Sequence, residues 1–178
     1  MSPVYDLPSN QEMCTPRWFV KQLESHIGTR FQLDAFASKR NTICRRFYDV
    51  QKNGLAHPWR WTTFCNSPFK LVKRAIAKAH EDAQNYDVVV VLIGPAGCSQ
   101  RWFHEHALHG TILVPTHRLI FLNDDLTPST GAMADNAVYI FGGPWWNTRG
   151  NIANGKFDVH ALEVPDGAEQ RELTKRRK

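Results

Sequence analysis

The chain has 178 residues, of which 42% are hydrophobic and 22% are charged. This length and composition predict one packed domain and exclude a disordered chain. The 22 Lys and Arg residues outnumber the 17 Asp and Glu residues, and the net charge of +5 is compatible with a polyanionic partner. The four cysteines stand far apart without a C-x-x-C pair, which argues against a zinc ribbon or a disulfide framework and fits a reducing cytoplasm. No apolar run is long enough to span a bilayer and no secretory leader is recognisable, so we expect neither export nor a membrane partner.

Helical and strand patterns alternate along the chain. Thr15 and Pro16 are typical of an N-cap and a first helical residue, and apolar residues then recur at helical spacing until Gly28. The near-continuous valines of 87–93 are typical of a strand buried on both faces. Segment 41–50 is compatible with a short helix or with irregular structure. The expected elements are a helix over 15–28, strands over 30–37 and 60–66, a helix over 69–84, a strand over 87–93, a helix over 99–110, and strands over 117–124 and 136–143.

This alternation predicts an α/β fold, in which a mostly parallel sheet is flanked by helices and the last two strands form an antiparallel pair at the C-terminal end. Ligands of such sheets bind outside the carboxyl ends of the strands. Asp34 and Asn66 both fall near such ends, so we expect them to lie close to a ligand site.

A short stretch with distinctive chemistry, Asn66-Ser67-Pro68-Phe69, ends the second strand and opens a helix. Methyl transfer to an exocyclic amine of a base requires hydrogen-bond acceptors for its N–H groups, because the lone pair of the amine is conjugated with the ring. The Asn66 side-chain oxygen offers one acceptor, and Pro68 restricts Ser67 to extended backbone, so that the Ser67 carbonyl can offer the second. Phe69 can stack on the base, which must be flipped out of a duplex to reach such a site. Without its flanking elements, the tetrapeptide is more typical of an ordinary turn, and the strand before it and the helix after it favour the site.

The chain resembles the compact phage-type DNA N6-adenine methyltransferases, the Dam-like family, over about residues 15–141. The resemblance lies in the order and spacing of the segments TPRWFVKQL, FQLDAFASKRN, RFYDV, W-x-W-x-x-F-C-N-S-P-F, VVVVLIGPAGCSQRWFHEHA, HRLIFLND and NAVYIFG. It implies a Rossmann-like methyltransferase fold, S-adenosyl-L-methionine as methyl donor, double-stranded DNA as partner and, for a phage-encoded chain, the host cytoplasm as location. On this basis 15–143 is the methyltransferase domain, 1–14 an N-terminal extension, and 144–178 a C-terminal loop and basic tail.

The resemblance also implies roles for individual residues. The family's catalytic motif, D/N-P-P-Y/F, corresponds to the stretch that begins at Asn66, and Asp34 in LDAFA matches an acidic position that contacts the donor. The residues implied for catalysis are Asn66, Ser67, Pro68 and Phe69, and those implied for donor binding are Thr15, Pro16, Asp34, Ala35 and Ala37. Whether Asp34 contacts the ribose or the methionine end of the donor stays open.

Three features depart from the family pattern. Ser67 stands where the family usually has proline, which frees one φ angle and adds an N–H group without altering the Asn66 amide. No Gly-x-Gly loop follows the first strand, so donor binding has no support from that fingerprint. The spacing from Asp34 to Asn66, 66 − 34 = 32 residues, is too short for many complete βαβ units.

Two groups of charged or titratable side chains have competing interpretations. Lys70, Lys73 and Arg74 can follow a DNA backbone or form a solvated helix face. His104, His106 and His109 crowd one expected helix, but a metal site would require further ligands, so we predict no metal.

Other functions remain open at this point. Methylation of cytosine N4, RNA or a protein glutamine would use the same tetrapeptide, because each substrate presents a planar conjugated amine. A non-enzymatic DNA-binding module, with Ser67 marking a decayed site, is a second alternative. A nucleotide-handling α/β enzyme is a third, although no phosphate-binding loop is present.

Overall fold

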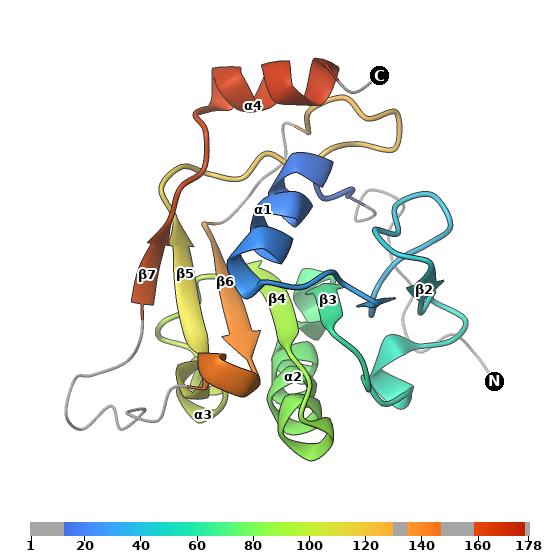
Figure 1. Ribbon diagram of the computed structural model, residues 1–178, viewed down its shortest axis with the longest axis vertical. Helices are drawn as coiled ribbons and strands as arrows, with labels where there is room; N and C mark the ends of the chain where they lie inside the picture. Colours follow the sequence, from blue (N-terminus) through green and yellow to red (C-terminus); the bar gives the residue numbers. More distant parts are fainter. Residues whose placement is uncertain (1–12, 130–134, 147–158, 177–178) are drawn as a thin grey trace.

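A computed structural model describes residues 13–129, 135–146 and 159–176 of the chain. Seven strands form one sheet in the order β2-β1-β3-β4-β6-β5-β7, with helices packed around it (Figure 1). The strands are β1 (Leu33–Asp34), β2 (Arg46–Phe47), β3 (Thr63–Asn66), β4 (Val90–Pro95), β5 (Thr111–Pro115), β6 (Asn136–Phe141) and β7 (Val159–Leu162). The α-helices are α1 (Arg17–Ile27), α2 (Val72–Tyr86), α3 (Arg101–Glu105) and α4 (Gly167–Lys175).

The sheet is covered on both faces by separate hydrophobic clusters. Val90 and Leu92 of β4 belong to the cluster that contains the apolar residues of α2 and α3. Val91 and Ile93 point to the opposite face and belong to the cluster that contains the apolar face of α1. The prediction that this valine-rich strand is buried on both faces is therefore confirmed.

The strand directions also agree with the predicted α/β fold. β6 is antiparallel to both of its neighbours, β4 and β5, whereas all other pairs are parallel. The strands β1, β3 and β4 therefore end at the same edge of the sheet, which we call the carboxyl edge. Asp34 of β1 is opposite Phe64 of β3, so Asn66 comes two residues further along at this edge.

One strand of the predicted antiparallel pair was misplaced. Residues 117–124 form no strand, and β6 pairs instead with β5, which precedes them in the chain. The run Thr-Ile-Leu-Val of β5 is rich in β-branched residues and follows Gly110 directly. In the later segment, the Ile120 N–H donates to the Gln170 side chain rather than to a neighbouring strand, and only Leu122 forms isolated bridges, with Cys14 and with Pro128.

The helix predicted over 99–110 is shorter and divided. α3 ends at Glu105, and a 3₁₀ turn (Ala107–His109) follows His106. The buried pairs Trp102–Phe103 and Ala107–Leu108 are five residues apart, which is about 1.4 turns of an α-helix. They would point in different directions on an unbroken helix, and the break at His106 allows both pairs to face the core.

Two described elements lie beyond residue 143, the predicted end of the main domain. β7 pairs in parallel with β5 and so extends the sheet, and α4 begins at a side-chain cap formed by Asp166. The domain boundaries remain predictions. None of the described helices has the length and apolar composition needed to cross a bilayer.

Candidate functional site

The Asn66 amide is oriented by a long-range hydrogen bond at the carboxyl edge. Asn66 is the last residue of β3, is partly exposed, and is held in register with Ile93 of β4. Its Nδ2 donates to the Thr15 Oγ1 at 3.2 Å. Because the amide nitrogen is used in this way, the side-chain oxygen is the atom that can accept a hydrogen bond from a ligand.

Thr15 is available for this contact because it does not cap α1, contrary to the prediction. Pro16 occupies the N-cap, with ψ at 133°, and no side chain caps the helix. Thr15 is only 6% exposed, and its neighbour Cys14 exchanges two backbone hydrogen bonds with Leu122, of 2.8 and 2.9 Å. The segment around Leu122, which was predicted to be a strand, thus holds the chain next to Thr15, and Thr15 orients Asn66.

The residues after Asn66 turn the chain directly into a helix. Pro68 has extended backbone, with φ −53° and ψ 142°, and its carbonyl accepts from the Leu71 N–H at 2.8 Å. Ser67 is buried, and its Oγ has no hydrogen-bond partner among the described residues. Phe69 opens the 3₁₀ turn Phe69–Leu71 and is 48% exposed. Its ring is accessible for stacking.

Asp34 is a buried carboxyl group that is only half satisfied. It is 2% exposed, and its Oδ2 accepts from the Ile43 N–H at 3.0 Å, whereas its Oδ1 has no partner among the described residues. Burial raises the pKa of Asp34 to about 7. A buried carboxylate oxygen without a donor is costly, so it marks a place where a ligand O–H or N–H can bind.

Ala35 and Ala37, which were also predicted for donor binding, are held by backbone hydrogen bonds just after Asp34. The Ala35 N–H donates to the Phe64 carbonyl at 2.9 Å, and the Ala37 N–H donates to the Tyr48 carbonyl at 3.0 Å. The Ala35 side chain is fully buried. A Cβ added to Gly54 would lie 2.0 Å from the Ala35 carbonyl oxygen, so Gly54 permits a close approach that supports the end of β1.

The three basic residues predicted to contact DNA are exposed beside this site. Lys70 lies in the turn that begins with Phe69, and Lys73 and Arg74 lie in the first turn of α2. They are therefore near the carboxyl edge in the chain and in space. Their role in DNA binding remains a prediction.

Two further features were not anticipated from the sequence. His80 of α2 stacks on His109 and approaches His106, with their Nδ1 atoms 3.3 Å apart, and burial lowers the pKa of His80 to about 4. Among the described residues, no group of three or more His, Cys, Asp or Glu side chains is arranged to hold a metal ion.

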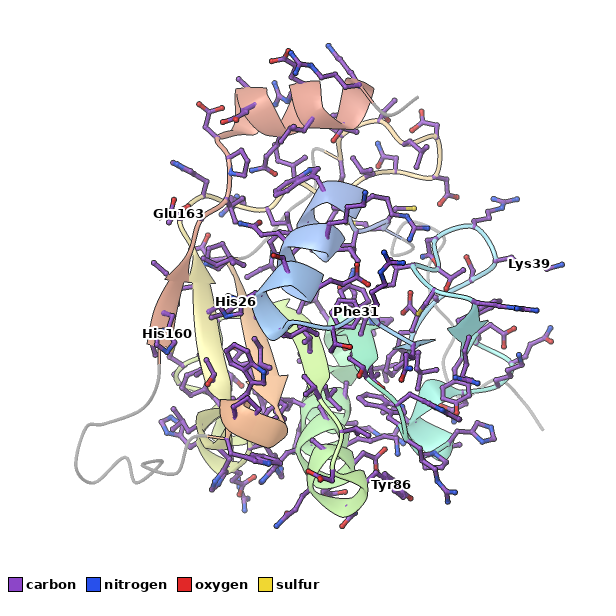
Figure 2. The ribbon with its side chains drawn as sticks, viewed as in Figure 1. His26, Phe31, Lys39, Tyr86, His160 and Glu163 are labelled. Atoms are coloured by element: carbon purple, nitrogen blue, oxygen red, sulfur yellow. The ribbon has the colours of Figure 1, made fainter. Side chains whose placement is uncertain are left out.

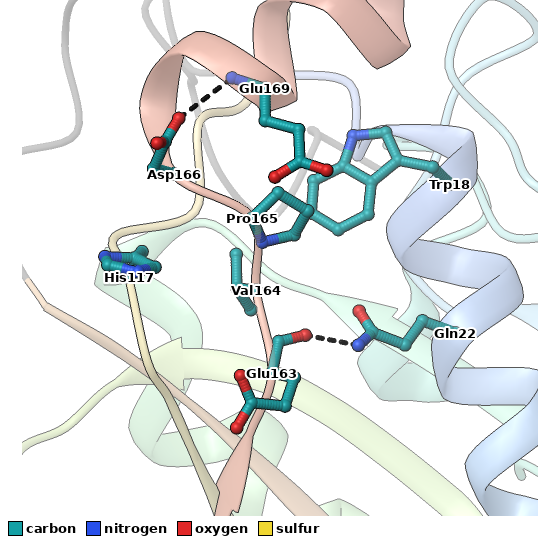
Figure 3. A pocket seen from close by; sticks show the side chains of 8 residues that line it. All are labelled: Trp18, Gln22, His117, Glu163, Val164, Pro165, Asp166 and Glu169. Atoms are coloured by element: carbon teal, nitrogen blue, oxygen red, sulfur yellow. Dashed lines mark hydrogen bonds between the residues drawn. The ribbon is translucent and has the colours of Figure 1, made fainter.

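An open cavity of about 510 Å³ lies between α1 and the segment from β7 into α4 (Figure 3). Its lining residues are Trp18, Gln22, His117, Glu163, Val164, Pro165, Asp166 and Glu169.

The mostly parallel sheet, with the antiparallel β6 between β4 and β5 and helices on its flanks, is consistent with a methyltransferase fold. The family model for DNA N-6-adenine-methyltransferase (Dam) matches residues 7–163, and the chain belongs to this family. A DNA N-6-adenine-methyltransferase of Escherichia phage T1 is 30% identical to the chain over 115 residues, which cover 64% of this chain and 45% of that relative. The matched part thus spans less than half the length of the relative. The predicted family membership is confirmed.

Proposed function

We propose that the chain transfers a methyl group from S-adenosyl-L-methionine to the N6 amine of an adenine that is flipped out of double-stranded DNA. The observation that carries this proposal is the partly exposed Asn66 amide at the carboxyl edge, whose nitrogen donates to Thr15, so that its oxygen is the atom left to accept a hydrogen bond. The family supports the same reaction. The partly exposed ring of Phe69, three residues later, supplies the surface on which the flipped base stacks.

The residues around Asp34 fit the methyl donor. When bound, S-adenosyl-L-methionine supplies a methyl group activated by a sulfonium, and it carries ribose hydroxyls and an ammonium group that are hydrogen-bond donors. The Asp34 Oδ1, which lacks a partner among the described residues, accepts from one of these groups. Ala35 and Ala37 follow this carboxylate closely in the chain, and we assign Thr15 and Pro16 to the same donor site through the family motif.

The chain's own residues act mainly by positioning and polarisation. The Asn66 oxygen and the Ser67 carbonyl accept the two N–H bonds of the adenine amine, which moves the nitrogen lone pair out of conjugation with the ring. The amine then forms the new N–C bond as the methyl group leaves its sulfur, and the extra proton on nitrogen is lost to water. No covalent bond to the protein forms.

Labelled S-adenosyl-L-methionine and unmethylated duplex DNA test this function directly. We expect the label in N6-methyladenine after digestion to nucleosides. Label in N4-methylcytosine, in RNA or in protein glutamine would assign the site to another conjugated amine. Salt-dependent DNA binding with no measurable affinity for the donor would instead identify a non-enzymatic DNA-binding module.

Replacing Phe69 with Ala is expected to lower kcat/KM for DNA by roughly 10- to 100-fold, because stacking contributes about 1–3 kcal/mol per base. Phe69→Trp keeps an aromatic face and should retain most of the activity. The affinity for the methyl donor, measured by calorimetry, should be the same in both variants. Equal kcat/KM values for wild type and Phe69→Ala would rule out the stacking role.

Thr15→Val is expected to lower kcat by about 2- to 10-fold, since it removes one hydrogen bond that orients Asn66 and keeps the side-chain volume. Thr15→Ser restores the hydroxyl group and should restore kcat. The resemblance to the family implies a position near the donor for Thr15 as well, so donor affinity is the discriminating measurement. A loss of donor affinity as large as the loss of kcat/KM would assign Thr15 to donor binding rather than to the orientation of Asn66.

A further inference from the structure

A strongly basic loop follows the donor-binding end of β1. Residues 38–46, which we call the basic loop, contain Lys39, Arg40, Arg45 and Arg46 and no acidic residue. All four side chains are exposed. Figure 2 shows Lys39 at the outer margin of the molecule, directed away from the sheet.

The basic loop is ordered by its own hydrogen bonds. The Ser38 N–H donates to the Asn41 Oδ1 at 2.7 Å, and the Thr42 N–H donates to the Ser38 carbonyl at 3.1 Å. The Arg17 guanidinium donates to the carbonyls of Thr42 and Ile43, at 2.7 and 2.9 Å. Because the backbone of the loop is already ordered, the loop loses little backbone conformational entropy when its side chains bind a partner.

These same contacts place the basic loop beside the proposed reaction site. The Ile43 N–H donates to Asp34, and Arg17, which anchors the loop, comes two residues after Thr15. Thr15 in turn accepts the hydrogen bond from Asn66. The loop and the Asn66 amide are therefore both attached by direct hydrogen bonds to one short segment of the chain at the start of α1, the loop by two from Arg17 and the amide by one to Thr15.

The opposite end of the sheet carries a lower density of positive charge. The sheet order separates β2, next to the basic loop, from β7, which leads into α4. Residues 163–178 contain four acidic and five basic side chains, a net charge of +1, against +4 for the basic loop. Glu163, Asp166 and Glu169 line the cavity beside α1 (Figure 3). A polyanion that reaches Asn66 is therefore attracted more strongly toward the basic loop than toward the segment that contains α4.

Two of the four cations have no competing intramolecular role in the described part of the chain. Arg46 lies over the Trp61 ring, 3.9 Å from its centroid, and Arg40 forms an exposed ion pair with Asp124 at 3.6 Å. Lys39 and Arg45 have no ion-pair partner among the described residues. They are thus the best placed to neutralise phosphates.

We infer that the basic loop is a binding surface for the DNA backbone, and that Lys39 and Arg45 contact phosphates next to the flipped adenine. This inference rests on the proposed function and assigns part of the surface with which the protein would bind DNA. Such contacts fix the position of the duplex without reading its sequence. The basic residues at the start of α2 follow Asn66 directly in the chain, so they also lie near the carboxyl edge of the sheet.

The test compares two double variants that remove the same charge. Lys39→Ala with Arg45→Ala alters the basic loop, whereas Arg30→Ala with Arg60→Ala alters exposed residues that precede β1 and β3, at the edge away from Asn66. Affinity for a fluorescein-labelled, unmethylated duplex of mixed sequence is measured by anisotropy over a range of salt concentrations. Donor affinity of the same samples is measured by calorimetry.

We expect the loop variant to bind DNA roughly tenfold more weakly or worse at about 0.1 M salt, and its salt slope to fall by about 1.8, since each phosphate contact contributes about 0.9. The control variant and the donor affinities should stay near wild type. Equal losses in both double variants would overturn the inference in favour of a general charge effect, as would an unchanged slope in the loop variant. A wild-type chain without salt-dependent DNA affinity would overturn the proposed function itself.

Discussion

Replacing Asn66 with Ala is expected to lower kcat for adenine methylation by about 10²- to 10³-fold, with little change in donor affinity. The variant removes an acceptor that acts on the reacting amine, and the loss of one such polar group in a pre-organised site typically has an effect of this size. The relevant measurements are kcat with saturating donor and DNA, and the dissociation constant of the donor by calorimetry.

Asn66→Asp is the matched control for this variant. It keeps a side-chain oxygen as acceptor, and Asp occurs at this position of the family motif, so it should retain more activity than Asn66→Ala. The Thr15 hydroxyl can donate to the new carboxylate and preserve the contact. If the two variants lose the same activity, the chemical contribution of the Asn66 oxygen is smaller than we propose.

Donor affinity is expected to rise with pH, and Asp34 is expected to be responsible. The pKa of its buried carboxyl is raised to about 7 in the free protein. Donor groups of the ligand bind the ionised carboxylate, which is about a tenth of the population at pH 6 and about nine tenths at pH 8. The dissociation constant of S-adenosyl-L-methionine should therefore be about tenfold higher at pH 6 than at pH 8, as measured by calorimetry.

The raised pKa of Asp34 has the opposite effect on the stability of the free protein, which is expected to fall as the pH rises. Because the folded-state pKa of Asp34 lies above its value in the unfolded chain, the protonated carboxyl favours folding below about pH 4, and this contribution is lost as the pH rises toward 7. Asp34→Asn should consequently stabilise the free protein at pH 8, by on the order of 2 kcal/mol, while weakening donor binding and removing its pH dependence. An Asp34→Asn variant that binds the donor with wild-type affinity at pH 8 would exclude the proposed role.

The sequence was sufficient to predict the features that depend on local pattern. The valine run of β4 and the strand-to-helix transition at Asn66 are encoded within a few residues, and their positions in a mostly parallel sheet are confirmed. The placement of Asp34 and Asn66 at one edge follows from the parallel direction of their strands.

The features that sequence reasoning missed depend on contacts between distant segments. Residues 117–124 have a strand-like composition, but the side chain of Gln170 takes the Ile120 N–H that a neighbouring strand would have bound. The Thr15 hydroxyl looks like a helix cap until the fold brings Asn66, 51 residues away, within hydrogen-bond distance. The basic loop could have been noticed from its charge, whereas its attachment to Asp34 and Arg17 required the structure.

The contact between the Asn66 oxygen and the adenine amine can be measured directly with a double-mutant cycle between protein and base. Wild type and Asn66→Ala are each titrated with duplexes that carry adenine or purine, which lacks the exocyclic amine, at the methylated position. We expect wild type to prefer adenine by about fivefold more than the variant does, a coupling of about 1 kcal/mol. Equal preferences in the two proteins would mean that Asn66 does not bind the amine, and would contradict the mechanism proposed for this site.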